Sequence, residues 1–224
     1  ADVRKENFDK IKVRSDTTQI TLVSQMRSKG ENDYMNFVDN LLNAKLEESA
    51  TKFNNSNYEL VMFDSMSSMM ERLQEMENKF GLCRSMSGYS WPWVSKKNAS
   101  KPDAIIDGVE MFWNRKSIDW INSTTEVNEM GCIHTVQGYD LNYSAIIFGE
   151  EITYDKHSKK IKVIKNNYYD TKGKQSLEND NELREYIIKI YKTMMYRGIR
   201  GTYIYVCDKN LREYFEEYIP IYNL

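Results

Sequence analysis

The sequence has few of the residues from which compact catalytic centres are built. It contains two histidines and three cysteines among 224 residues. The cysteines, Cys83, Cys132 and Cys207, lie far apart and form no Cys-x-x-Cys pair, which favours buried thiols in a reducing cytoplasm. Two histidines without a neighbouring acid cluster provide little for a metal site or a Ser-His-Asp triad. A self-contained nuclease or hydrolase is therefore a poor interpretation, and we predict no metal ligands.

Long apolar runs and a strong net charge are missing as well. No stretch approaches eighteen consecutive apolar residues, so we expect no membrane association and a cytoplasmic location. The formal net charge of −2 provides no global basic field, so binding of nucleic acid would require a local patch or another domain. The chain begins at Ala1 rather than at a methionine, and we expect it to be a part of a longer protein.

The phosphate-binding loop Gly-x-x-x-x-Gly-Lys-Ser/Thr is also absent. Gly30 and Gly88 are not followed by Gly-Lys-Ser/Thr, and the pair Gly173-Lys174 is followed by Gln175. No predicted strand ends in the paired acids that hold magnesium and orient water in nucleoside triphosphatases. The chain therefore carries at most half of a nucleoside-triphosphate site.

The residues that are present predict an α/β domain. A hydrophobic content of 41% supports a packed core, and 29% charged residues are typical of a globular protein. Short apolar runs predict strands, and apolar residues at helical spacing predict helices, including a methionine-rich one that we assign to the core. This order favours a mostly parallel sheet with helices on both faces. We predict strands at 19–23, 58–63, 80–87, 143–148 and 202–207, and helices at 34–46, 66–80, 183–194 and 211–219.

Three of these helices have candidate capping residues. Asn32 or Asp33 precedes the first, and Asp208 precedes the last. Asn179 lies three residues before Glu182, which is the spacing of a capping pair.

Two segments interrupt the alternation of predicted strands and helices. Residues 152–165 predict a β-hairpin with a basic tip, in which His157 is expected to be solvated. Residues 90–125 contain all four tryptophans, Trp91, Trp93, Trp113 and Trp120, together with basic residues. The tryptophans could form a small satellite core under a long loop, which is the reading we favour. The alternative is a single-strand contact in which Trp91 and Trp93 stack on bases while Lys96 and Lys97 bind phosphates.

The segment 131–140 is the strongest candidate for chemistry. It is a short polar stretch between two apolar runs, and it contains His134, Gln137, Gly138 and Asp140. These residues can hydrogen-bond a ligand or allow it to approach closely, and loops beside buried strands commonly carry function. The alternative is a tight strand-to-strand connection with a satisfied core histidine.

Three motifs carry a resemblance to known proteins. His134-Thr135-Val136-Gln137-Gly138-Tyr139-Asp140 resembles the fifth motif of superfamily 1 helicases, Ser24-Gln25-Met26-Arg27-Ser28 the fourth, and Met194-Met195-Tyr196-Arg197-Gly198 the sixth. The sequences of residues 87–93 and 200–208 resemble those of a bacterial helicase-like family of unknown function, which is related to the Schlafen group 3 DNA/RNA helicase domain. The resemblance covers nearly the whole chain.

This resemblance implies that residues 18–224 form the second RecA-like domain of a helicase motor, after a linker remnant or stray helix at 1–17. Arg27 and Arg197 would then reach the triphosphate across a cleft, with Arg200 as a less favoured competitor of Arg197. Asp140 would reach the ribose beside Gln137 and Gly138, although the family more often has Glu at this position. His134, Thr135 and Gln137 would couple the nucleotide to a bound strand.

The implied partners are a preceding P-loop domain, which would hold ATP and Mg2+, and single-stranded DNA or RNA. The chain alone is expected to bind neither ATP nor Mg2+ and to be inactive. A non-motor module that binds nucleic acid or protein without turnover is the alternative function.

Two features of the sixth motif bear on the site that the resemblance implies: the first concerns its fine geometry, and the second counts against a site shared with His134. Met194-Met195-Tyr196 replaces the usual Ala-Leu-Thr, so the threonine hydroxyl is lost. Arg197 is expected at a helix-to-strand junction next to a glycine that permits an abrupt turn and close approach, whereas His134 is expected in a loop that follows a strand. In a parallel sheet these two kinds of connection lie at opposite edges.

Overall fold

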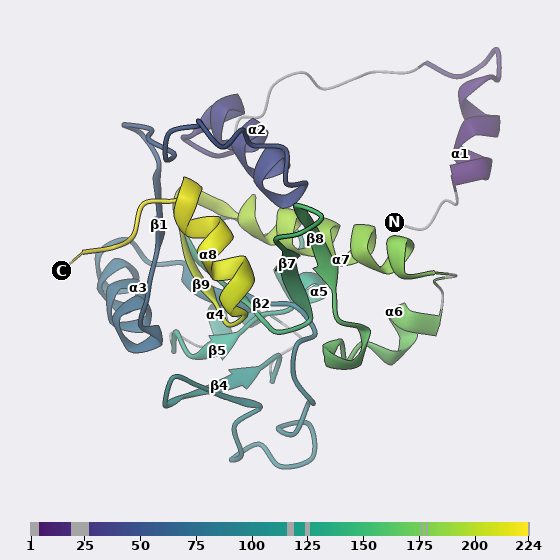
Figure 1. Ribbon diagram of the computed structural model, residues 1–224. Coiled ribbons are helices and arrows are strands. Elements are labelled where there is room, and N and C mark those ends of the chain that lie inside the picture. Colours follow the sequence, from purple (N-terminus) through teal and green to yellow (C-terminus); the bar gives the residue numbers. More distant parts are fainter. Residues whose placement is uncertain are drawn as a thin grey trace.

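Four parallel strands form the central sheet of this protein (Figure 1). The computed structural model describes residues 5–18, 27–115, 119–123, 126–175, 177 and 179–223. The strands are β1 (Glu59–Met62), β2 (Cys83–Ser87), β6 (Leu141–Phe148) and β9 (Gly198–Val206), in the spatial order β1-β9-β6-β2. Every neighbouring pair is parallel. The predicted α/β class with a mostly parallel sheet is therefore confirmed.

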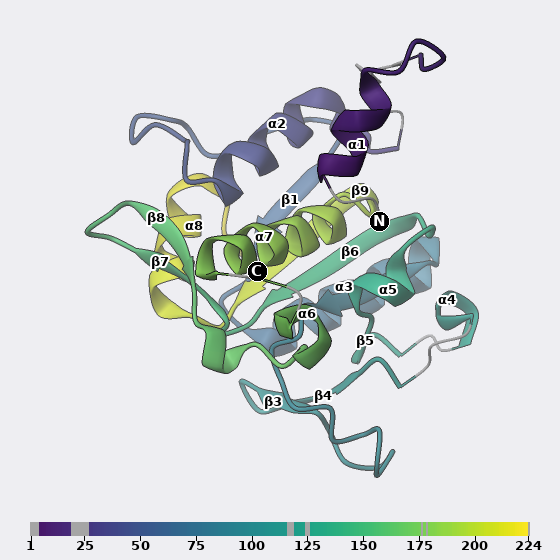
Figure 2. The same cartoon turned by 90° about the vertical axis from the view of Figure 1, so that its right-hand side faces the viewer.

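Helices cover both faces of the sheet (Figure 2). Alternating side chains of β6 point to opposite faces, so Ile146 and Phe148 join one core while Ala145 and Ile147 join the other. The first core contains α2 (Glu31–Leu42), α7 (Asp180–Met195) and α8 (Lys209–Tyr218). The second contains α3 (Met66–Phe80), whose buried methionines confirm the core assignment.

Two of the three predicted caps are confirmed. The Asn179 side chain accepts a hydrogen bond from the Glu182 N–H at 3.0 Å, and Asp208 caps α8 by accepting from the Leu211 N–H at 2.8 Å. The predicted cap of α2 by Asn32 or Asp33 is wrong, because the helix begins after Gly30. A Cβ atom on Gly30 would lie 2.6 Å from the Tyr34 Cβ atom, so close packing at this helix end requires glycine.

Strand boundaries differ from the predictions where a helix and a strand adjoin. Phe80 belongs to α3, so β2 begins only at Cys83, after a turn in which Leu82 has a φ of 52°. The strand predicted at 19–23, together with Ser24, Gln25 and Met26, lies outside the described residues.

The two interruptions of the fold are small β structures. The predicted hairpin is confirmed as β7 (Ile152–Asp155) paired with β8 (Lys160–Val163), and it packs beside α8. In the tryptophan-rich region, β3 (Ala104–Ile106), β4 (Val109–Trp113) and β5 (Glu129–Met130) form a three-stranded sheet. This inserted sheet therefore extends to Met130, five residues beyond the predicted boundary at 125.

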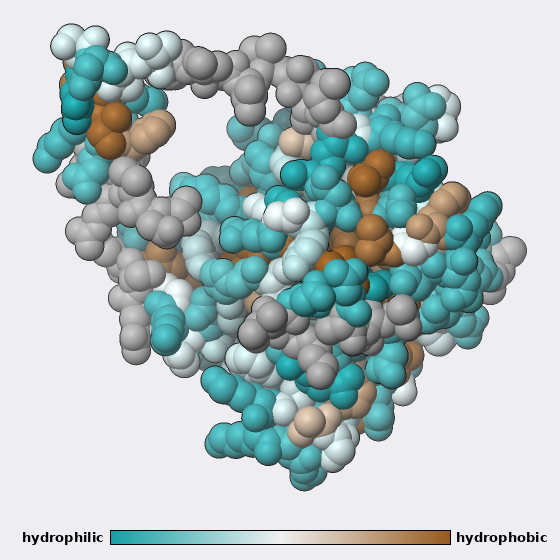
Figure 3. Space-filling view, turned by 180° about the vertical axis from the view of Figure 1, so that it is seen from behind, coloured by the Kyte–Doolittle hydropathy of each residue, from teal (hydrophilic) through white to brown (hydrophobic). Residues whose placement is uncertain are grey.

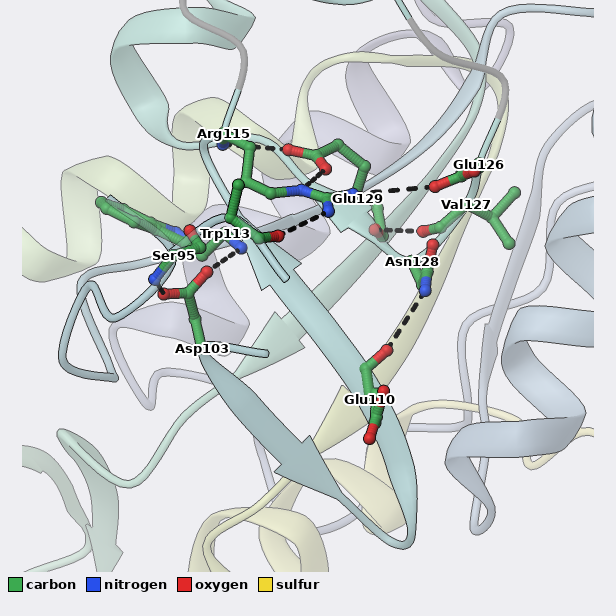
Figure 4. A network of polar contacts seen from close by, with 11 residues as sticks. Ser95, Asp103, Glu110, Trp113, Arg115, Glu126, Val127, Asn128 and Glu129 are labelled. Carbon is green, nitrogen blue, oxygen red and sulfur yellow. Dashed lines mark hydrogen bonds and ion pairs between the residues drawn. The ribbon is translucent and has the colours of Figure 1, made fainter. Parts of the chain in front are cut away.

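Two buried carboxylates tie the inserted sheet together (Figure 4). Asp103 accepts hydrogen bonds from the backbone N–H groups of Ser95 and Trp113, both at 2.7 Å. Glu129 accepts from the backbone and the side chain of Arg115, at 2.9 and 2.5 Å. Burial raises the pKa of Glu129, and the Arg115 guanidinium opposes that rise. These contacts hold the loop that carries Lys96 against a fixed scaffold.

The remaining elements are short. They are α1 (Lys5–Lys12), α4 (Trp120–Ser123), α5 (Ile133–Val136), a 3-10 turn at Lys165–Asn167 and α6 (Thr171–Gln175). The face seen from behind is mainly hydrophilic, with hydrophobic side chains in small groups (Figure 3). A membrane-crossing helix, long and apolar enough for the task, is not found in the part of the chain that the structure describes.

Candidate functional site

The two strands at the centre of the sheet both begin beside predicted site residues. Asp140 directly precedes β6, and Arg197 directly precedes β9. Because β6 and β9 are parallel neighbours with Leu141 opposite Gly198, both residues lie at the amino-terminal edge of the sheet. The backbone N–H of Leu141 donates to the Arg197 carbonyl at 2.9 Å, which joins the two junctions directly.

The expected separation of the two kinds of connection holds for His134, which lies beside Tyr89 after the carboxyl end of β2, but not for Asp140, because the segment 131–140 contains a short helix. Cys132 is the N-cap residue of the short helix α5, so residues 137–140 lead from a helix into a strand, as Arg197 does. Gly131, before the helix, forms an isolated parallel bridge with Met86 of β2. Two helix-to-strand junctions of parallel strands fall at the same edge, which is the physical reason for their meeting.

Arg27 completes a cluster of three charges at this edge. Its guanidinium forms an ion pair with Asp140, and the two side chains are 39% and 48% exposed, so the pair is open to a ligand. The backbone N–H of Lys29 donates to the Ile199 carbonyl at 2.8 Å and so fixes the segment that follows Arg27 against the start of β9. Arg27, Asp140 and Arg197 thus come from three distant parts of the sequence.

Arg197 is half-buried beside this ion pair. Its Nε–H donates to the Thr193 carbonyl in the last turn of α7 at 3.2 Å. Burial lowers the pKa of Arg197, the Arg27 charge lowers it further, and Asp140 opposes both effects. Arginine nevertheless stays protonated, so two cations face one carboxylate and the cluster has an excess positive charge. Such a cluster attracts a polyanion such as a triphosphate.

Gly198 allows the close backbone approach that was expected of it, but it does not make the abrupt turn. It is the first residue of β9, and a Cβ atom there would lie 2.3 Å from the Gly201 carbonyl oxygen. Gly198 is therefore required for close backbone approach, while the turn itself is made at Tyr196 and Arg197.

The other residues of the fifth motif occupy different surroundings. Gln137 is exposed directly after α5, and Gly138 has a φ of +90°, a conformation that favours glycine. Thr135 is buried, and its hydroxyl accepts from the Cys132 N–H at 2.8 Å, so it closes the start of α5. His134 is exposed and lies beside the ring of Tyr89, with centroids 6.4 Å apart. Gln137 and Gly138 therefore adjoin Asp140, whereas His134 faces the loop after β2.

Arg200 lies on the opposite face of the sheet from Arg197. Its Nε–H donates to the Asn142 side chain at 3.0 Å, and its guanidinium packs 4.6 Å from the ring centroid of Phe80 at the end of α3. Arg197 instead contacts α7, which covers the other face. Arg200 lines a cleft of about 410 Å³ at the same edge, together with Lys29, Tyr58 and Tyr143.

The four tryptophans divide into two pairs. Trp113 and Trp120 are core residues, with exposed fractions of 4% and 1%. Trp91 and Trp93 are half-buried on the second core, and Trp93 packs edge-on against Trp113 with centroids 5.4 Å apart. The Lys96 ammonium lies 4.8 Å from the Trp93 ring centroid, and the Lys97 side chain is exposed. The prediction of a separate satellite core is therefore wrong, because Trp120 and Trp113 belong to the first and second main cores, while Trp91 and Trp93 retain accessible surface.

A hydroxyl cluster beneath the charges was not identified from the sequence. Tyr34, Tyr58, Ser144 and Thr202 are buried and meet around the Thr202 hydroxyl. One sequence signal could have indicated this cluster: Ser144 and Thr202 are polar residues within or beside apolar runs, where a buried hydroxyl needs a hydrogen-bond partner.

Phosphate is the cofactor group that the described site suits. The arginines offer planar donor groups that match phosphate oxygens. Among the described ranges, no group of three or more His, Cys, Asp or Glu side chains could hold a metal ion.

Comparison with known proteins places these residues in a family context. Residues 3–208 match the model of the family "Schlafen group 3, DNA/RNA helicase domain". The chain is 27% identical over 215 residues to the yeast "Uncharacterized protein YPL245W" of Saccharomyces cerevisiae, covering 86% of this chain and 46% of the yeast protein. The chain thus spans about half of that relative, which is eukaryotic rather than bacterial. No solved structure matches.

Proposed function

This chain belongs to the Schlafen group 3 DNA/RNA helicase domain family, and we propose that it is the C-terminal motor half of an ATP-dependent DNA or RNA helicase or translocase. In this proposal the chain is a second RecA-like domain. It contributes arginines and coupling residues to an ATP site that a preceding P-loop domain of the same protein completes.

The meeting of Arg27, Asp140 and Arg197 at one open edge of the sheet carries the proposal. Three motif segments that are far apart in the sequence supply one charge each, and the cluster has a net positive charge. Transfer of a phosphoryl group is accelerated mainly by positioning and by positive charge around the phosphate, and an arginine from a second domain supplies both.

The chain's own residues have distinct tasks in this scheme. Arg197 would bind γ-phosphate oxygens from its fixed position at the end of α7, and Arg27 would exchange its ion pair with Asp140 for contacts with the triphosphate. Asp140 would then be available to the ribose. ATP and Mg2+ would be held by the P-loop domain, where magnesium supplies charge neutralisation between the phosphates.

A single strand of DNA or RNA is the proposed polymer substrate. Gln137, exposed between α5 and Asp140, is placed to connect the strand with the nucleotide, because it shares one short segment with Asp140. The half-buried Trp91 and Trp93, with Lys96 and Lys97, form the candidate strand contact on the inserted sheet.

Steady-state ATP hydrolysis by the full-length protein and by residues 1–224 alone tests this proposal. We expect turnover that rises with added single strands in the full-length protein, and none in the isolated chain, which lacks the phosphate loop. Strand binding by a full-length protein that has no turnover would favour the non-motor module instead. Turnover by the isolated chain that survives repurification and disappears in Arg197→Ala would contradict the division into two halves.

A further inference from the structure

Four buried hydroxyl groups meet directly beneath the charged edge of the sheet. The Thr202 hydroxyl lies 2.7 Å from that of Tyr58, 2.9 Å from that of Ser144 and 3.1 Å from that of Tyr34. Each of these four residues is at most 3% exposed. Because buried hydroxyls are costly without partners, such a cluster fixes the elements that contribute to it.

The cluster bonds to the main chain on both sides of Arg197. The Tyr34 hydroxyl donates to the Met195 carbonyl at 3.0 Å, and the Thr202 hydroxyl approaches the same oxygen at 3.3 Å. The Tyr58 hydroxyl approaches the Gly198 carbonyl at 3.4 Å. The turn that carries Arg197 is therefore held two residues before and one residue after the arginine.

The same hydroxyls reach the segment that carries Arg27. The side chain of Ser28, which is 5% exposed, hydrogen-bonds to the Tyr58 hydroxyl and accepts from the Gly30 N–H at 3.1 Å. The rings of Tyr34 and Tyr58 lie 4.1 Å apart, and Gly30 packs against both with no room for a side chain. Arg27 is thus attached, through its neighbour, to the network that holds Arg197.

The hydroxyls remain neutral donors at physiological pH. Burial raises the pKa of Tyr34 and of Tyr58 far above the ordinary tyrosine value. The contacts therefore hold the backbone without adding a charge next to the two arginines.

We propose that the cluster of Tyr34, Tyr58, Ser144 and Thr202 positions Arg27 and Arg197 relative to each other, so that both arginines can bind one triphosphate. This inference rests on the proposed function, and it makes the four residues positioning residues for that site.

Turnover by variants of the full-length protein tests the positioning role. Thr202→Val keeps the shape of the side chain and removes its hydroxyl, and Tyr58→Phe removes the hydroxyl and keeps the ring. We expect each variant to lower kcat for ATP about 10-fold while KM changes little, because misplaced arginines weaken mainly the contacts made in the transition state. Thr202→Ser, which keeps the hydroxyl, should restore kcat.

Tyr214→Phe is the matched control. The Tyr214 hydroxyl is also buried and donates one hydrogen bond, to the Leu41 carbonyl at 2.9 Å, but it joins α8 to α2 away from the charged edge. Tyr58→Phe and Tyr214→Phe should shift the melting temperature similarly, and only Tyr58→Phe should lower kcat.

The outcomes separate the two ideas. Unchanged kcat in Thr202→Val and Tyr58→Phe, with Arg197→Lys inactive, would overturn the positioning role and leave the proposed function intact. If kcat fell equally in Tyr214→Phe, the loss of activity would reflect general destabilisation of the fold. This result would also overturn the positioning role. If the wild-type protein hydrolyses no nucleotide, the proposed function fails and the positioning role fails with it.

Discussion

The two edges of the central sheet differ in what they expose. At the amino-terminal edge, Arg27, Asp140 and Arg197 form an open charged cluster above buried hydroxyls. At the carboxyl-terminal edge, the connection after β6 contains Glu151, which is completely buried and accepts a hydrogen bond from the Tyr191 hydroxyl at 2.5 Å. The first edge therefore exposes charged side chains, whereas the second buries a carboxyl group in the core.

This difference is the reverse of the usual arrangement in open α/β sheets, where ligands bind beyond the carboxyl ends of the strands. Two glycines at that edge are closely packed: a Cβ atom on Gly149 would lie 2.2 Å from the Ser90 hydroxyl oxygen, and one on Gly88 would lie 2.8 Å from a Glu151 carboxylate oxygen. The chemistry proposed for this chain therefore belongs at the amino-terminal edge.

Arg197→Lys should produce the largest effect and separates the two edges most clearly. Lysine keeps the charge but loses the planar fork, so ATP turnover by the full-length protein should fall on the order of 10³-fold. Arg212→Lys at the carboxyl-terminal edge, where the guanidinium donates to the Val206 carbonyl at 2.6 and 2.9 Å, should leave kcat within about 2-fold. Equal losses in both variants would mean that the amino-terminal edge has no special role.

Trp91→Ala and Trp93→Ala test whether the tryptophan-rich region, which follows the carboxyl end of β2, contacts single-stranded DNA or RNA. Each should weaken single-strand binding by about 1–3 kcal/mol, as for loss of one base stack, in titrations at low salt. The melting temperature of Trp93→Ala should also fall because its contact with Trp113 is lost. Ile105→Ala, which truncates a 67% exposed side chain of the same sheet, should change neither property. If the affinity for single strands were unchanged in both tryptophan variants, these residues would have a structural role only.

Gln137→Ala tests whether the amino-terminal edge couples strand to nucleotide. Strand-stimulated hydrolysis should fall about 10-fold, the value of one hydrogen bond to a charged group, while basal hydrolysis changes less than about 2-fold. Gln74→Ala on α3, where the side chain donates to the Asn78 side chain at 3.1 Å, is the control. A parallel fall of basal and stimulated rates would indicate damage to the fold rather than lost coupling.

Glu151→Gln should give the smallest effect and addresses the carboxyl-terminal edge. Burial raises the pKa of Glu151, against the opposing hydrogen bonds of Ser90 and Tyr191 and with a contribution from Glu150. As pH rises above 4.5 the unfolded chain ionises first, so the wild-type free energy of unfolding falls until the folded-state pKa is passed. Glutamine cannot ionise, so the variant should lose this dependence and be more stable at pH 8, by on the order of 1 kcal/mol.

Thermal or denaturant unfolding at pH 4 and pH 8 measures this difference. Glu150→Gln, at the exposed neighbouring position, should follow the wild-type pH dependence. If the free energy of unfolding depended on pH identically in the wild type and in Glu151→Gln, the pKa of the Glu151 carboxyl would not be raised by burial. The buried carboxyl would then be ionised in the folded protein.

Much of the fold could be predicted because the signals are local. The stripe of apolar residues in α7, its Asn179 cap and the Asp208 cap of α8 depend on neighbours within one helical turn. The hairpin at 152–165 is local as well. The helix α5 was not predicted, since four residues are too few to show a helical period, and the closed turn depends on a hydrogen bond from Cys132 to Thr135.

The sequence by itself determined the four strands of the central sheet, the long helices and the three motifs that carry Arg27, Asp140 and Arg197. Only the tertiary structure decided that these residues share one edge, because that depends on the parallel pairing of β6 with β9 and on the bond between Leu141 and Arg197. The hydroxyl cluster was equally hidden: Tyr34 and Thr202 are 168 residues apart, and no local pattern reports a hydrogen bond across that distance. Burial supplies the physical reason, since hydroxyls excluded from water must find one another.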